Sequence, residues 1–127
     1  MDLPKQQSNR FKDTHSFEKR CQDARAVRTQ YPERVPVIIE VAKGCQYTLD
    51  KHKYLVPNDL TAGQFMYVVR KRSNISEDRA LFLFTHDGAL PAISMLMTTF
   101  YESYKDKDGF LYLLIASEST FGHRGLC

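Results

Sequence analysis

Few side chains in this sequence could carry out covalent chemistry, and their spacing matches no catalytic or metal-binding motif. The cysteines include no CxxC pair, which argues against a zinc site and a disulfide framework: Cys21, Cys45 and Cys127. The histidines form no HExxH or related ligand spacing: His15, His52, His86 and His123. A hydrolase needs a nucleophile and a base that are held together, and no Cys/His pair here has a local signature of one. The sequence therefore predicts no enzyme activity, no metal site and no bound cofactor.

The other candidate for chemistry is the C-terminal segment, where small and polar residues lead from Ala116 to Phe121 and Gly122. Glycine has no Cβ, so an attacking cysteine, and later an amine, can approach its carbonyl closely. Such a narrow segment could thread into an active site and present a carboxylate. Gly125 is a rival cleavage point that lacks the preceding Phe. The residues alone fit a frayed terminus with an incidental glycine equally well.

Size and composition predict a single soluble domain. A chain of 127 residues can bury a core without disulfides or metal ions. Its hydrophobic share of 43% and charged share of 26% are ordinary for a globular protein. No apolar run approaches the roughly 20 residues that span a membrane, and residues 1–13 lack a secretory signal, so we expect a cytoplasmic protein. A formal charge of +3 allows acidic partners or an anionic membrane but is too small to indicate nucleic-acid binding.

The elements that would position a functional surface centre on residues 51–72. Residues 54–56 (YLV) are typical of a short strand, and Pro57 ends it because proline has no N–H for a ladder. Thr61 then has the position of a helix N-cap, and Gln64 completes a capping box. We expect a helix over residues 61–72.

This helix has an apolar face and a basic end. Leu60 and Phe65 occupy the two positions of a hydrophobic staple and are expected as core residues as well as pocket walls. Val68 and Val69 continue the apolar face at helical spacing. Basic residues flank the unit on both sides: Lys51, Lys53, Arg70, Lys71 and Arg72. A solvated helix end that complements the helix dipole is the simpler explanation of the last three, and contact with an enzyme or a membrane is the alternative.

Two further elements precede this unit. Ser16 has the position of a cap for a helix whose apolar residues recur at nearly 3.6-residue spacing: Phe17, Cys21, Ala24, Val27 and Tyr31. Residues 35–41 alternate as a strand does. Pro36 within them indicates an edge position or the first residues of the strand, because a central strand needs that N–H.

The remaining patterns follow the central helix. Residues 80–85 predict a strand, which a hairpin-type turn at 86–88 and a short extended piece at 89–90 follow. Ser94 is expected to cap a helix with mostly buried apolar residues: Leu96, Met97, Phe100, Tyr101 and Tyr104. The almost wholly apolar run 110–115 is typical of a central strand that is covered on both faces.

The order of these elements predicts the fold. Two sequential hairpins with a helix packed on one side make an α+β domain of the ubiquitin-like β-grasp kind, here with an N-terminal helical extension. We expect residues 1–12 to be a mobile extension, residues 13–116 to be the domain, and residues 117–127 to be a flexible tail.

Several segments occur together in register: residues 17–20 (FEKR), 31–38 (YPERVPVI), 53–57 (KYLVP), 59–61 (DLT), 63–65 (GQF), 70–72 (RKR) and 121–122 (FG). They resemble the autophagy ubiquitin-like modifiers, the family of microtubule-associated protein light chain three and the GABA-receptor-associated protein. The resemblance covers about residues 10–122. It implies a β-grasp core with an added N-terminal helical region.

The resemblance implies a fate for the tail. A cysteine protease would cut after Gly122 and remove residues 123–127. An activating enzyme and conjugating enzymes would then deliver the new carboxylate to phosphatidylethanolamine, the one covalent group we expect. One acyl chain anchors a protein only marginally, whereas a two-chain lipid would hold this one on autophagosomal or vesicle membranes.

The resemblance also implies a groove for cargo receptors and adaptors whose peptides carry an aromatic residue followed three positions later by Leu, Ile or Val. The peptide would pair with residues 53–56 if that strand lies at a sheet edge. The aromatic pocket would use Asp23, Val27, Pro36, Ile38, Lys51, Lys53, Leu55 and Phe110. The aliphatic pocket would use Arg34, Tyr54, Val56, Pro57, Leu60, Phe65 and Val68. Acidic neighbours of the motif would be attracted by basic residues at the rim: Arg34, Lys51, Lys53 and Arg72.

Two other functions remain open. The chain could be a ubiquitin-like modifier that is joined to protein rather than lipid, or a peptide-binding adaptor that is never conjugated. The tail distinguishes these functions, because only the lipid-conjugated modifier yields a form that ends at Gly122 and bears phosphatidylethanolamine.

Overall fold

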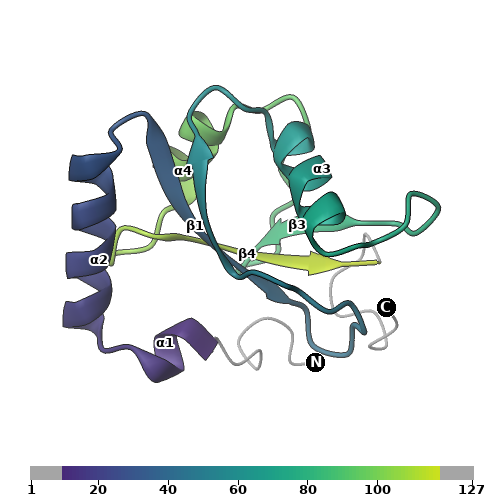
Figure 1. The fold of residues 1–127 in the computed structure, drawn as a ribbon, viewed down its shortest axis with the longest axis horizontal. Helices are drawn as coiled ribbons and strands as arrows, with labels where there is room; N and C mark the ends of the chain where they lie inside the picture. The colour runs from purple at the N-terminus through teal and green to yellow at the C-terminus, as the bar shows by residue number, and fades with distance from the viewer. Residues whose placement is uncertain (1–9, 118–127) are drawn as a thin grey trace.

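The computed structural model describes residues 10–117, which form a sheet with helices on both faces (Figure 1). In chain order the elements are α1 (Arg10–Thr14), α2 (Phe17–Gln30), β1 (Arg34–Val41), β2 (Lys53–Pro57), α3 (Ala62–Arg72), β3 (Phe82–Thr85), α4 (Met97–Tyr104) and β4 (Leu111–Ala116). The predicted order of helices and strands is confirmed from α2 onward, whereas α1 was not predicted. The extended piece expected at residues 89–90 is not a strand; the Ala89 carbonyl instead accepts the Thr85 N–H (2.9 Å) and closes the turn.

The four-stranded sheet has the order β2-β1-β4-β3. β1 and β4 run parallel in the centre, while β2 pairs antiparallel with β1 and β3 antiparallel with β4. Every residue of β4 is buried, as expected for a central strand covered on both faces. This is the β-grasp arrangement that the element order predicted.

Pro36 lies in an inner strand, so the expectation of an edge position was wrong and its alternative, a place near the strand's start, holds. The Ile39 N–H donates to the His52 carbonyl (2.8 Å), so the N–H groups of odd-numbered β1 residues face β2. The nitrogen of Pro36 therefore faces β4. Pairing with β4 begins one residue later, at Val37. The missing N–H costs the ladder no hydrogen bond.

Two layers of helices cover the two faces of the sheet (Figure 1). The larger core lies under α3 and α4, and it is centred on Phe65, Val69, Met97 and Phe100. The opposite face is covered by α1 and α2, where Ala24, Ile38, Phe110 and Tyr112 form a second cluster. A different apolar cluster therefore lies on each face of the sheet, and β2 runs between the two.

Residues 10–12 are not part of a mobile extension, and this part of the expected boundary was wrong. They belong to α1, which lies against the sheet. The Phe11 ring centroid is 5.1 Å from that of Phe110, and the Phe11 N–H donates to the Glu40 carboxylate (3.3 Å). Lys12 adds an ion pair with Asp106 (2.8 Å). One aromatic and one basic residue in a polar segment carry no periodic signal. Residues 1–9 lie outside the described part of the chain.

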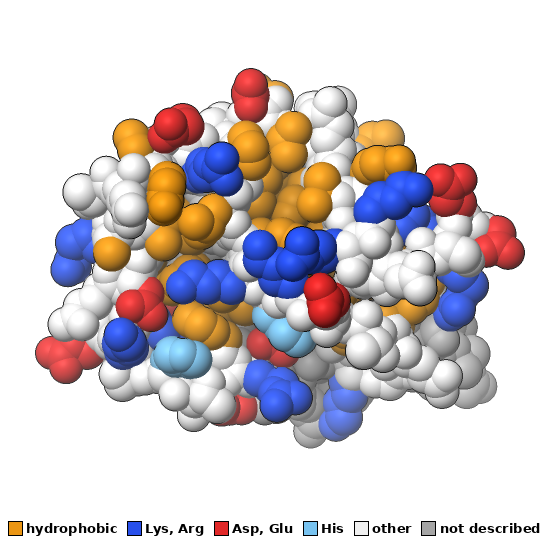
Figure 2. Space-filling model, viewed as in Figure 1, with side chains coloured by type: hydrophobic (Ala, Val, Ile, Leu, Met, Phe, Trp, Pro, Cys, Tyr) orange, Lys and Arg blue, Asp and Glu red, His pale blue; other side chains and the backbone are white. Residues whose placement is uncertain are grey.

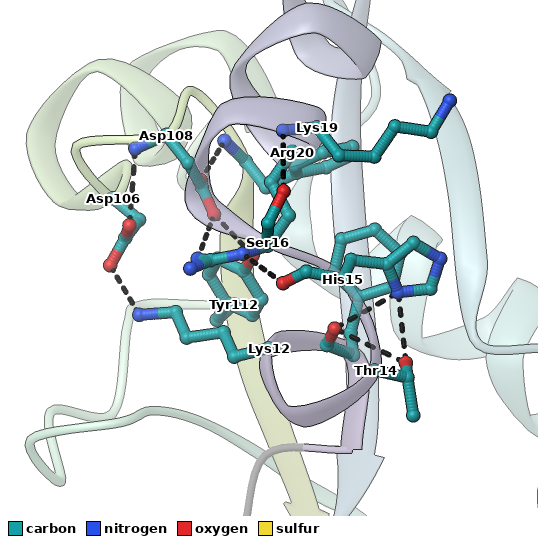
Figure 3. Close-up of polar contacts among 11 residues, drawn as sticks. Lys12, Thr14, His15, Ser16, Lys19, Arg20, Asp106, Asp108 and Tyr112 are labelled. Atoms are coloured by element: carbon teal, nitrogen blue, oxygen red, sulfur yellow. Dashed lines mark hydrogen bonds and ion pairs between the residues drawn. The ribbon is translucent and has the colours of Figure 1, made fainter.

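A buried ion pair fastens α2 to the turn before β4 (Figure 3). Arg20 Nη1 lies 2.7 Å from Asp108 Oδ2, and the two side chains are 11% and 0% exposed. Asp108 Oδ1 accepts the Phe110 N–H (2.8 Å), and the Tyr112 hydroxyl donates to Oδ2. Burial, together with the bond to Asp108, raises the pKa of Tyr112, so the phenol stays a protonated donor. These contacts fix the position of α2 relative to the sheet.

The predicted start of α3 is confirmed in detail. Thr61 Oγ1 accepts the Gln64 N–H (3.1 Å), and Gln64 Oε1 accepts the Thr61 N–H (2.9 Å), which completes the capping box. Phe65 and Val69 are buried as expected. Val68 is instead 40% exposed and lies on the outer side of the helix.

We expect Thr61→Ala to lower the free energy of unfolding by about 1 kcal/mol, because the Gln64 N–H loses its acceptor, Thr61 Oγ1, while the bond from the Thr61 backbone N–H to Gln64 Oε1 can remain. Urea denaturation followed by circular dichroism would measure the change. Thr99→Ala, at an exposed position inside α4, is the matched control and should cost less. Equal effects of the two substitutions would contradict a capping role.

The helix expected after Ser94 begins later than predicted, and Ser94 does not cap it. The N-cap is Leu96, which makes no side-chain capping bond. Instead, Leu96 forms a backbone bridge with Thr61, and the Met97 N–H donates to the Leu60 carbonyl (2.8 Å). The main chain before α3 therefore fixes the start of α4. The expected burial is confirmed for Met97, Phe100 and Tyr101, whereas Leu96 and Tyr104 are exposed.

Three further observations concern the described residues alone. None of their helices is long and apolar enough to cross a membrane. They contain no group of three or more side chains that could hold a metal ion. Cys21 is a half-buried free thiol.

Candidate functional site

β2 lies at the edge of the sheet, as the predicted groove requires. Val37 lies opposite Tyr54, and Val35 lies opposite Val56. These pairs follow the hydrogen-bonded pair Ile39–His52 at intervals of two residues, so they are hydrogen-bonded pairs as well. The backbone groups of Tyr54 and Val56 therefore face β1. Those of Lys53 and Leu55 face outward, where an added strand could pair with them.

The side chains of β2 alternate between the two faces of the sheet. Tyr54 and Val56 join the core under α3. Lys53 lies opposite Ile38 and Leu55 opposite Pro36, on the face that α2 covers. An extended chain along this edge would thus meet a different apolar surface on each side.

The structure brings most of the predicted aromatic-pocket residues together on the α2 face. Ile38 and Phe110 are fully buried and form the floor. The Lys53 ammonium lies 5.7 Å from the centroid of the Phe110 ring, so it covers this floor. Pro36 is buried and Leu55 half-buried beside them. An aromatic side chain could reach Phe110 only if the Lys53 side chain moved.

The remaining predicted members of the aromatic pocket lie around this floor. Asp23 and Val27 are half-buried, one turn apart on α2, next to the buried Ala24. Asp23 forms an ion pair with Lys19 (3.4 Å). Lys51 does not join them: its ammonium lies 5.1 Å from the ring centroid of Tyr54, a residue of the opposite face.

The predicted aliphatic-pocket residues divide into core and surface. Tyr54, Val56 and Phe65 are at most 5% exposed, and the rings of Tyr54 and Phe65 meet edge to face at 5.4 Å. Burial raises the pKa of Tyr54, whose phenol therefore stays neutral. Leu60 and Val68 reach the surface.

Pro57 and Arg34 complete the aliphatic set. Pro57 is half-buried at the end of β2. Arg34 lies opposite Pro57 and two residues before Pro36, so the register places Arg34 and Pro57 on the α2 face rather than the α3 face. The Arg34 guanidinium donates to the outward-facing Leu55 carbonyl (3.4 Å). An added strand that paired with this carbonyl would have to replace the bond or share it.

Basic side chains gather across the face that carries β2, with apolar side chains around them (Figure 2). Arg72 Nε lies 3.5 Å from Asp50 Oδ2 in an exposed ion pair, which solvent screens. Arg70 differs from Arg72, because its guanidinium is bonded within the chain: it donates to the carbonyls of Ser76 (2.6 Å) and Arg79 (2.8 Å). Of the basic helix end, Arg70 thus has a structural role that the sequence did not indicate.

An open apolar pocket of about 590 Å³, which no sequence pattern indicated, lies beside the aliphatic set. Its walls include Tyr67, Val68 and Ile93, all of which are exposed. Ile93 lies in an irregular loop and follows no helical or strand period, so pattern analysis gives it no role.

Phe121 and Gly122, the predicted processing and conjugation residues, lie outside the described residues. Their roles therefore stay predictions.

Comparisons with known proteins show similarity in both sequence and fold. The family model described as "Autophagy protein Atg8 ubiquitin like" matches residues 19–122. The chain is 52% identical over 113 residues to Autophagy-related protein 8 of Mycosarcoma maydis, covering 88% of this chain and 95% of that protein. It is 51% identical over 115 residues to Autophagy-related protein 8 of Emericella nidulans, covering 90% and 97%. The crystal structure of Trypanosoma brucei ATG8 superimposes with a TM-score of 0.83 at 43% identity, covering 91% of this chain and 100% of the other.

Proposed function

Because the chain belongs to the Atg8 family of ubiquitin-like autophagy proteins, we propose that it is a lipid-conjugated modifier that recruits peptide-bearing partners to membranes. Cleavage after Gly122 and conjugation to phosphatidylethanolamine would anchor it on autophagosomal membranes. The edge of β2 would then bind cargo receptors and adaptors. The chain itself would catalyse no reaction.

The observation that carries the peptide-binding part is the outward-facing edge of β2 between two apolar surfaces. An added strand would form hydrogen bonds with the backbone groups of Lys53 and Leu55. These bonds give affinity for any extended peptide, whereas the pockets select among side chains.

The two faces of β2 explain the spacing of the proposed motif. In an extended chain, residues that are three positions apart point to opposite faces. An aromatic residue would enter the α2 face over Phe110, and the aliphatic residue three positions later would enter the α3 face beside Leu60 and Val68. A spacing of four would place both side chains on one face.

Simple energetics place this binding in the micromolar range. Each anchor contributes roughly 1.5–3 kcal/mol when it is fully buried. Two anchors and a few strand hydrogen bonds, less the cost of ordering the peptide, give about −8 kcal/mol. Displacement of Lys53 from Phe110 is part of that cost. The basic rim favours partners with acidic flanking residues.

The tail supports the membrane part of the proposal. The residues matched by the family model end at Gly122. A phosphatidylethanolamine molecule attached there would supply two acyl chains, enough for stable anchoring. The partners are then a cysteine protease, activating and conjugating enzymes, and the membrane. The alternatives are a modifier joined to protein and an unconjugated adaptor, and intact-mass analysis of the tail distinguishes them.

We expect Lys53→Ala with Leu55→Ala to weaken binding of an aromatic-x-x-Leu peptide at least tenfold, because one residue covers the aromatic pocket and the other forms its side. Isothermal titration calorimetry would measure the dissociation constants. A peptide with the anchors four positions apart should bind weakly to the unmodified chain.

The matched control removes one lysine and one leucine elsewhere: Lys107→Ala with Leu90→Ala, both at exposed positions outside the proposed groove. This variant should bind the peptide normally. Denaturation midpoints of both variants would verify folding. Unchanged titration curves for the β2 variant would refute the groove.

A further inference from the structure

The apolar pocket on the outer side of α3 is walled by Leu60, Gln64, Tyr67 and Val68 on one side and Ile93 on the other. Tyr67 is 54% exposed and Ile93 67%. Large apolar side chains that surround a hollow mark an interaction surface more often than scattered ones do. Neither Tyr67 nor Ile93 belongs to the two pockets of the proposed groove.

The main chain holds this pocket in shape. The Gly63 N–H donates to the Ile93 carbonyl (2.9 Å), and the Ala62 N–H donates to the Met95 carbonyl (2.8 Å). These are N–H groups of the first turn of α3, which have no partner within the helix. A Cβ on Gly63 would lie 3.2 Å from the Ile93 carbonyl oxygen, so the loop lies in close contact with the helix. The pocket therefore needs no rearrangement to form.

The pocket is continuous with the proposed aliphatic pocket, because Leu60 and Val68 belong to both. A peptide whose aromatic anchor lies near Lys53 and whose aliphatic anchor lies near Pro57 runs in the same direction as β2. Its next residues therefore continue towards α3.

The geometry of an extended chain determines which peptide residue after the aliphatic anchor would point towards α3. Residues two positions apart point to the same face and are about 7 Å apart. The residue two positions after the aliphatic anchor would thus face α3 beside the shared wall. The residue one position after the anchor would face away.

We propose that the pocket binds a third apolar side chain of the same partner, so that the preferred motif is aromatic-x-x-aliphatic-x-apolar. The inference rests on the proposed groove and names a narrower class of partner for it. Ile93 is then a specificity-determining residue: it selects among peptides that share the first two anchors.

Three peptides with the same two anchors test this inference. The first has Leu two positions after the aliphatic anchor, the second has Ser there, and the third has Ser there and Leu one position after the anchor. With the full-length chain, the first should bind roughly fivefold more tightly than the second, about the effect of partly burying one leucine in an open pocket. The third should show no gain.

Ile93→Ser is the matched variant of the chain. It should abolish the gain from the first peptide and leave the affinity for the second unchanged. The substitution leaves the main-chain bond to Gly63 intact, because that bond uses the Ile93 carbonyl. Denaturation midpoints would verify that the variant is folded.

The outcomes separate this inference from the function on which it rests. Equal binding of all three peptides would overturn the third pocket and leave the groove in place. No binding of any peptide would overturn the groove, and the inference with it. A concentration-dependent dimer that sedimentation velocity detects for the unmodified chain but not for Ile93→Ser would assign the pocket to a second copy and also overturn the inference.

Discussion

The Gly122→Ala variant is expected to stay at its full length of 127 residues in its native cytosol and to yield no lipid-bearing form, whereas the unmodified chain should be shortened to Gly122. The reason is steric. The scissile carbonyl must be approached first by the protease's cysteine and then, as a thioester, by an amine, and a Cβ on that residue obstructs both approaches. Intact-mass spectrometry of cytosolic and membrane fractions would measure the outcome.

Gly125→Ala is the matched control for this experiment, since it changes the rival glycine by the same methyl group. It should be processed and conjugated normally. If Gly125→Ala blocks shortening and Gly122→Ala does not, cleavage occurs at the rival position. Recovery of only the intact unmodified chain, with none on membranes, would contradict the lipid proposal and favour an unconjugated adaptor.

The second large effect concerns stability: Arg20→Met should lower the free energy of unfolding by about 3–5 kcal/mol. The Asp108 carboxylate is fully buried and lies 2.7 Å from the guanidinium. Removing Arg20 leaves this charge with only the Tyr112 hydroxyl and the Phe110 N–H as partners. Urea denaturation at neutral pH would measure the loss.

Lys105→Met is the matched control, because Lys105 forms an ion pair with Glu102 at the same 2.7 Å, with both side chains exposed. Such a pair contributes less than about 1 kcal/mol, since solvent screens it. Similar effects of the two substitutions would contradict the role of burial. Arg20→Met should also weaken peptide binding, because Arg20 holds α2, which carries Asp23 and Val27.

Much of the fold could be predicted because its signals are local. The Thr61–Gln64 capping box depends on residues three positions apart and was confirmed bond by bond. The apolar run at 110–115 indicated a central strand, and β4 is one. The predicted cap at Ser94 failed because the competing bonds to that segment come from Leu60 and Thr61, more than 30 residues away in sequence.

The candidate site was predicted in part. The family resemblance implied that Lys53 and Leu55 belong to one pocket, and their pairing with Ile38 and Pro36 places both on the same face of the sheet. Alternation does not indicate how deep a side chain lies. Only the folded chain shows that Lys53 covers Phe110, and that Lys51 lies over Tyr54 on the opposite face.

The sequence by itself determined the order of helices and strands from α2 onward, the start of α3 and the family resemblance, because each of these depends on neighbouring residues or on short motifs. Tertiary structure alone decided which strand lies at the edge, that residues 10–12 dock on the sheet, and that Arg20 meets Asp108 across 88 positions of sequence. It also placed Ile93 beside Tyr67 to form a pocket. These features arise from contacts between distant segments, whose partners are set by packing rather than by any local period.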